Sequence, residues 1–258
     1  MQAPDPQDQE LSFLEHLVEL RSRLLKACLA ILIILLILLP FARSLYGWLS
    51  APLTAVLPEG SSMIAIDVAS PFLTPFKLAL LLSLILAIPV VLYQLWAFVA
   101  PALYREEKRL ARPLLYSSVF LFYAGCAFAY FVVFPLVFGF FTRVAPEGVT
   151  VMTDISKYLD FVMTLFLAFG LAFEVPIATI ILVATGVTSI DQLTRARGYI
   201  LVGAFAVGMI LTPPDVISQT LLALPMWLLF EAGILMSRIL LPHRKSKATK
   251  DPADQATS

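Results

Sequence analysis

The sequence predicts an all-α integral membrane protein with six transmembrane helices, both termini in the cytoplasm and a short last pair of spans. Three observations support this. Of the 258 residues, 60% are hydrophobic and 14% are charged, and the mean hydropathy is +0.89, whereas about a quarter of the residues in soluble domains are charged. Long apolar runs recur along the chain, and Lys and Arg gather in alternate connecting segments. A soluble protein of this length cannot bury so much apolar surface, which excludes soluble enzymes, disordered chains and coiled coils.

Residues 1–23 predict a cytoplasmic helix that lies at the membrane interface. Ser12 and Glu15 have the spacing of a capping box, so the helix is expected to begin there. Leucines recur at helical spacing on one side and can face the membrane. On the other side, Glu19 and Arg23 are four residues apart and predict an ion pair. The alternative is that Glu19 receives a cationic partner.

Six apolar runs predict the membrane domain, residues 24–237, because about 20 apolar residues cross the roughly 30 Å hydrocarbon core. The predicted spans are approximately 24–42, 78–104, 113–142, 161–185, 198–213 and 216–237. The last two share a short stretch of chain with a turn near Pro213 and Pro214, so each barely crosses; a re-entrant hairpin is the alternative. The polar tail, residues 238–258, is expected to be disordered and cytoplasmic.

The orientation follows from the basic residues. Of the 18 Lys and Arg, 14 lie in the N-terminal segment, the loops after spans two and four, and the tail. The other four lie in the segments on the opposite side. The positive-inside rule therefore places both termini in the cytoplasm.

Two acidic features are not needed for this topology. Glu106 and Glu107 lie in the basic loop after span two, where they either neutralise their neighbours or receive a positive group of a ligand. Glu174 lies within span four, where an ionisable group is costly and by default functional. Pro176 cannot bond to the carbonyl of Ala172, which leaves an acceptor near Glu174.

The sequence contains no pattern typical of an enzyme. It has no phosphate-binding loop, no nucleophile elbow and no paired histidines. Its two cysteines lie inside apolar runs and do not have the spacing of a zinc site. We therefore expect no catalytic residue, metal or cofactor, and the zero net charge predicts no nucleic-acid partner.

Five segments resemble the TatC family, the polytopic subunit of the twin-arginine protein translocase. They are FLEHLVELRSRL at 13–24, AIDVASPF at 65–72, YQLWAFVAPALY at 93–104, AFGLAFEVP at 168–176 and LTPPDVISQ at 211–219. They follow one another in order from about residue 12 to residue 240, and none is of low complexity. The resemblance implies a multi-pass protein of the bacterial inner membrane.

The resemblance also implies a receptor function. Such proteins bind the signal peptide of folded cargo, in which consecutive arginines precede an apolar stretch. The signal-binding carboxylates of the family match Glu19 and Glu107, Phe98 matches an aromatic position of the same site, and we place Arg21 there too. Glu174 matches an intramembrane glutamate that faces the concave side of the molecule.

The implied partners are the single-span subunits TatB and TatA, membrane lipid and further TatC copies in a hetero-oligomer that uses the proton gradient. The resemblance places a docking surface for them on the last two spans, with Met209, Thr212 and Gln219. The alternative hypothesis is a proton- or ion-coupled transporter of small solutes that uses Glu174. An inverted repeat would favour that alternative, and we find none in the sequence.

Overall fold

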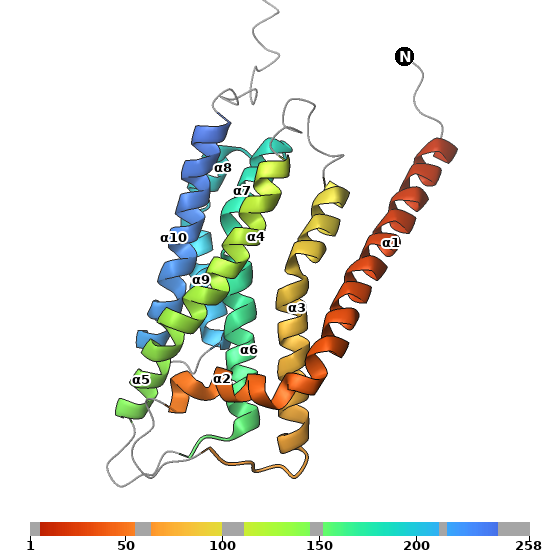
Figure 1. Ribbon diagram of the computed structural model, residues 1–258. Helices are drawn as coiled ribbons and strands as arrows, with labels where there is room; N and C mark the ends of the chain where they lie inside the picture. The colour runs from red at the N-terminus through yellow and green to blue at the C-terminus, as the bar shows by residue number, and fades with distance from the viewer. Residues whose placement is uncertain (1–5, 55–62, 100–110, 145–151, 212–215, 242–258) are drawn as a thin grey trace, which may run out of the picture. The chain divides into compact units, whose positions relative to one another are not determined.

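The computed structural model describes residues 6–54, 63–99, 111–144, 152–211 and 216–241 (Figure 1). Within these ranges the chain is helical, and its only β-type pairing is an isolated bridge between Ile64 and Asp154. The chain divides into two compact units, Met1–Ala172 and Phe173–Ser258, which we call unit 1 and unit 2.

Unit 1 begins with a long helix, α1 (Pro6–Leu38), which starts before the predicted capping box at Ser12. The helix is continuous through residue 23, so the predicted interfacial helix and the first predicted span share one helix. A 3₁₀ turn, η1 (Leu39–Phe41), follows, with a proline in its first turn. Because proline donates no backbone hydrogen bond, the α-helix ends here. Figure 1 shows that the next helix, α2 (Ala42–Thr54), turns sharply away from the axis of α1.

The helix α3 (Ser70–Val99) packs along α1 in the antiparallel direction (Figure 1). At the bend after α1, the buried side chains of Leu35, Ala42 and Ala79 form one cluster, so the turn into α2 is fixed against α3. The helix α3 begins eight residues before the predicted span at 78, since its first turns carry charged and polar residues that a count of charge-free runs leaves out.

The third helical stretch contains α4 (Ala111–Phe128), a π-helical segment η4 (Ala129–Val133) and α5 (Phe134–Val144). In η4 the backbone N–H of Phe134 donates to the carbonyl of Ala129, five residues earlier. The helix α6 (Ile155–Ala172) packs against α4 and α3.

Aromatic rings fill the core of unit 1. The ring centroid of Phe134 lies 5.2 Å from that of Phe166, and the ring of Phe138 lies 5.4 Å from that of Tyr158. Further toward the other end of α6, the backbone at Gly170 approaches the ring of Phe122 so closely that an added Cβ would be 2.7 Å from its Cε2 atom. The absence of a side chain at residue 170 therefore permits α4 and α6 to meet.

Two tyrosine hydroxyls connect α2 to the first turn of α6. The buried hydroxyl of Tyr158 donates to the carbonyl of Leu49 at 2.8 Å, and that of Tyr46 donates to the carbonyl of Ile155 at 3.5 Å. The shorter bond satisfies a hydroxyl that has no access to water, so we expect it to contribute more to stability.

Unit 2 contains α7 (Val175–Ala184), α8 (Ile190–Arg195), α9 (Arg197–Leu211) and α10 (Val216–Leu240), with α10 packed against both α7 and α9. The turn after α7 contains Gly186, whose φ of 78° favours glycine.

Five helical stretches within the described residues are long and apolar enough to cross a membrane. They are Leu17–Ala51, Ser70–Phe98, Arg112–Phe140, Ile155–Ala184 and Leu222–Leu240. A shorter apolar helix covers Arg197–Ile210 and overlaps the predicted short fifth span, 198–213.

Candidate functional site

The predicted ion pair on α1 is present. Nε of Arg23 lies 2.9 Å from Oε1 of Glu19, and Nη2 of Arg23 contacts the same oxygen. The Glu19 side chain is 39% exposed and that of Arg23 is 23% exposed, so the pair lies at a surface that solvent or a ligand can reach. Arg21, two residues from Glu19 and therefore on another side of the helix, is exposed.

Phe98 lies one residue before the end of α3 and is partly exposed. Figure 1 shows the N-terminal part of α1, the end of α3 and the start of α4 at the same end of unit 1. Glu19 lies on α1 and Phe98 lies on α3, two helices that contact each other and that move apart toward this end in Figure 1. Glu106 and Glu107 lie outside the described residues.

Glu174 lies at an interruption between two helices. The helix α6 ends at Ala172 and α7 begins at Val175, with Pro176 in its first turn. The carbonyl of Glu174 accepts the N–H of Ala178 at 2.9 Å, and its side chain is partly buried. The interruption coincides with the proline that the sequence singled out as removing a backbone donor.

The residues expected to dock partners have different environments. Gln219 on α10 donates through Nε2 to the carbonyl of Phe205 at 2.8 Å, so its amide joins α9 to α10. Gly208 faces Gln219 closely, since an added Cβ would be 3.3 Å from its Cγ. Met209 is 55% exposed. Thr212 lies outside the described residues.

A second connection between α9 and α10 was not predicted from the sequence. Nη2 of Arg197 donates to Oε2 of Glu231 at 2.7 Å, and Nε lies 2.6 Å from Oε1, so the two side chains form an ion pair with one hydrogen bond. It joins the first residue of α9 to the middle of α10. The two residues are 34 positions apart, so no local spacing rule could reveal the pair, although Glu231 was noticeable as a charge within an apolar run.

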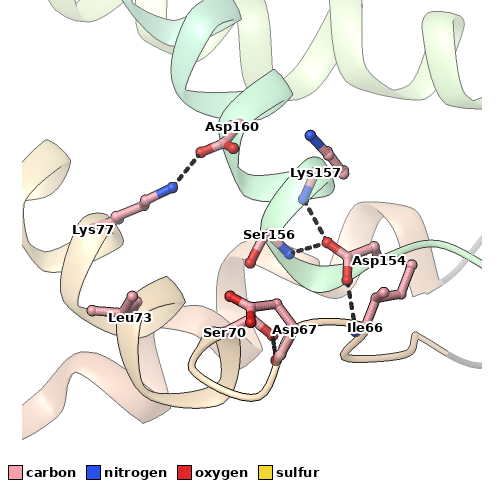
Figure 2. Close-up of a pocket in the computed structure, with 9 residues that line it drawn as sticks. All are labelled: Ile66, Asp67, Ser70, Leu73, Lys77, Asp154, Ser156, Lys157 and Asp160. Carbon is pink, nitrogen blue, oxygen red and sulfur yellow. Dashed lines mark hydrogen bonds and ion pairs between the residues drawn. The ribbon is translucent and has the colours of Figure 1, made fainter.

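The end of unit 1 opposite the start of α1 carries a cap, which we define as residues 63–69 and 152–157 (Figures 1 and 2). Ile64 and Thr153 join its two segments, because the N–H of Ile64 donates to the carbonyl of Thr153 at 3.0 Å. The carboxylate of Asp154 accepts the N–H of Ile66, and also those of Ser156 and Lys157 in the first turn of α6, each at 3.0 Å. Asp154 therefore caps α6 and also holds the other segment of the cap, residues 63–69, which leads into α3.

These hydrogen bonds also affect the acidity of Asp154. The pKa of Asp154 is lowered because backbone N–H groups stabilise its charged form. The N–H of Ile66 has the largest effect, and that of Lys157 the next largest. Beside it lies a pocket of about 300 Å³, shown in Figure 2, in which Nζ of Lys77 lies 3.0 Å from Oδ1 of Asp160. Sequence reasoning missed this cluster; the one local signal was an aspartate directly before an apolar helix.

The described residues hold no group of three or more His, Cys, Asp or Glu side chains placed to bind a metal ion. Within the described residues, carboxylates pair with cationic side chains at Glu19, Asp160 and Glu231.

Comparison with known proteins gives one consistent result. The family model described as Sec-independent protein translocase protein (TatC) matches residues 15–225. The protein of that name from Azotobacter chroococcum is 58% identical over 255 residues, which covers 99% of this chain and 100% of the relative. The one from Escherichia coli is 59% identical over 232 residues, 90% of each chain. A crystal structure of the twin arginine translocase receptor TatC matches with a TM-score of 0.77 at 39% identity, and covers 87% of this chain and 98% of that one.

Proposed function

This chain belongs to the TatC family of Sec-independent protein translocase proteins, and we propose that it is the core receptor of a twin-arginine translocase, which binds the twin-arginine signal peptide of folded cargo at its cytoplasmic face. Members of this family are multi-pass membrane proteins that serve as components of a protein translocase, and the family is not one of enzymes.

The observation that carries the proposal is the carboxylate of Glu19, which already holds a guanidinium at a partly exposed position. A carboxylate that accepts N–H groups of one arginine has the chemistry to accept those of another. We propose that Glu19 and Glu107 each pair with one arginine of the signal, with Arg21 and Phe98 at the same site. Lysine is a poorer ligand, because it lacks the planar fork of donors.

We propose that the chain crosses the bacterial inner membrane six times, with both termini in the cytoplasm. The helices α9 and α10 then provide the two short spans, residues 238–258 form a cytoplasmic tail, and the cap lies on the periplasmic side. The distribution of Lys and Arg supports this orientation. The length of Leu222–Leu240, which is long and apolar enough to cross a membrane, favours two spans over a re-entrant hairpin.

We further propose that the surface of α9 and α10 docks the single-span partners TatB and TatA in an assembly with several copies of this chain, driven by the proton gradient. Met209 supports this proposal because an exposed thioether suits an adaptable apolar contact. We propose that Gln219 fixes the relative position of α9 and α10 at that surface, because its amide already joins the two helices. We propose that Glu174 is a polar group within the membrane-spanning part of the chain. Membership of a translocase family favours this function over the solute-transporter alternative.

Binding of a fluorescent signal peptide to the full chain in nanodiscs tests the receptor proposal. An Arg-Arg peptide is compared with a Lys-Lys peptide for the wild type, Glu19→Gln and Glu107→Gln. Loss of a charged hydrogen-bond partner costs about 1.5–3 kcal/mol, so each substitution should raise the Kd of the Arg-Arg peptide at least about tenfold.

The matched control is Glu106→Gln, which removes the same charge from the neighbouring residue and should leave the Kd nearly unchanged. If Arg-Arg and Lys-Lys peptides bind the wild type equally, and neither Glu19→Gln nor Glu107→Gln weakens binding, the carboxylates do not read the signal and the receptor assignment of these residues is wrong.

A further inference from the structure

The carboxylate that we assign to cargo binding is already occupied by the chain itself. Arg23 places Nε at 2.9 Å from Oε1 of Glu19 and a second guanidinium nitrogen on the same atom. These are the same donor groups that a signal-peptide arginine would present. Residues four apart on a helix face the same side, whereas Arg21 is only two residues away and cannot reach Glu19 in this way.

We propose that Arg23 is an internal competing ligand of Glu19, which the first cargo arginine must displace. This inference rests on the proposed function of Glu19 as a signal-binding carboxylate. In the unliganded protein, Arg23 keeps the carboxylate paired. On binding, one guanidinium exchanges for another on Oε1, and Arg23 is released to solvent or to the lipid phosphates at the interface.

The strength of the internal pair sets the size of the effect. A pair of this spacing on a helix surface favours the paired state about twofold. About one third of the molecules then have an accessible carboxylate, and the apparent Kd of a ligand is raised by the reciprocal of that fraction, about threefold. The factor is the same for every ligand that uses Glu19. Arg23 therefore lowers affinity without changing the preference for arginine over lysine.

A purely structural pair predicts something different. If Arg23 only orients the Glu19 carboxylate or stabilises α1, its removal leaves binding unchanged or weakens it. The direction of the change in Kd separates the two possibilities, because only a competitor gives tighter binding when it is removed.

The test uses the full chain in nanodiscs with fluorescent Arg-Arg and Lys-Lys peptides. We expect Arg23→Gln to lower the Kd of both peptides about two- to threefold and to leave their ratio unchanged. Arg23→Lys keeps the charge but loses the fork, and should give a smaller decrease. Lys26→Gln is the matched control, because it removes one exposed positive charge from the same helix without contacting Glu19. Any change that it produces measures general charge repulsion and is subtracted.

A double-mutant cycle gives the decisive comparison. In a Glu19→Gln background there is no carboxylate to release, so adding Arg23→Gln should no longer tighten binding. The inference is overturned if Arg23→Gln weakens binding, matches Lys26→Gln, or tightens binding equally in the Glu19→Gln background. If Glu19→Gln itself leaves the Kd unchanged, the proposed function of Glu19 fails, and this inference fails with it.

Discussion

The close contact between α4 and α6 predicts that Gly170→Ala destabilises unit 1. The new methyl group would be 2.7 Å from Cε2 and 2.9 Å from Cζ of Phe122, so the ring must retreat by about 0.7 Å to reach an ordinary contact of 3.4 Å. Phe122 is only 2% exposed, and the ring cannot move without displacing its neighbours. Overpacking of this kind costs about 1–3 kcal/mol, and the better helix propensity of alanine returns about 0.5–1 kcal/mol. We expect a net loss of about 1–2 kcal/mol.

The measurement is thermal unfolding in detergent, and the readout is the reaction of a thiol-specific dye with Cys126. This cysteine is buried in α4, four residues after Phe122, and becomes accessible when unit 1 unfolds. Cys28 is exposed and would react before unfolding, so all proteins carry Cys28→Ser. The expected loss corresponds to a decrease in Tm of roughly 2–8 °C.

Gly139→Ala is the matched control, since an added Cβ there has no atom within 4 Å. It should raise Tm slightly through helix propensity alone. Adding Phe122→Leu to Gly170→Ala should recover part of the loss because it gives the methyl group space. A Gly170→Ala protein that unfolds at the same temperature as Gly139→Ala would refute the reasoning.

Three further predictions concern polar contacts. Because hydrogen bonds lower the pKa of Asp154 in the folded protein, the ionised carboxylate stabilises the fold fully at pH values above 3.8, the ordinary pKa of the group. This stabilisation is lost as the pH falls below 3.8 toward the lower pKa of the folded protein, so the difference in Tm between the wild type and Asp154→Asn should narrow in acid. Arg197→Gln should lower Tm by the equivalent of about 1 kcal/mol, and exchanging the two charges, Arg197→Glu with Glu231→Arg, should restore much of that loss. An unchanged Tm in the single variant would show that the ion pair does not stabilise the fold. Tyr158→Phe should lower the free energy of unfolding by about 1 kcal/mol in the same assay, whereas Tyr46→Phe should lower it clearly less. Equal losses of stability would show that the 2.8 Å and 3.5 Å hydrogen bonds contribute equally.

Local and compositional features of the fold were predictable from the sequence. The helical class, the apolar stretches and the Glu19–Arg23 pair depend on residues within one or two helical turns, where periodicity and spacing are informative. The helix limits were less accessible. The helices α3 and α6 begin at Ser70 and Ile155, several residues before their charge-free runs, since the search for apolar runs finds the part that matches hydrocarbon and omits turns that carry Lys77 and Asp160.

Long-range polar contacts were not predictable. The carboxylate of Asp154 accepts a hydrogen bond from Ile66, 88 residues away, and the Arg197–Glu231 pair also depends on how helices pack. A single sequence shows that such groups are polar but does not show which partner satisfies them. The signal-binding assignments of Glu19 and Phe98 came from the family resemblance, and the structure adds the helices that carry them.

The π-helical segment η4 makes the third helical stretch tolerant of changes in chain length. A π turn holds one residue more than an α turn, while the helices on either side keep the faces that they present. Deleting one residue within 129–133 would convert the segment to an ordinary turn and leave Phe134 directed at its aromatic neighbours. The same deletion beside Phe122 would rotate everything beyond it by about 100°. Over evolutionary time, single-residue insertions and deletions in this stretch are therefore expected to accumulate at η4, where a lineage can gain or lose a residue without remaking its core.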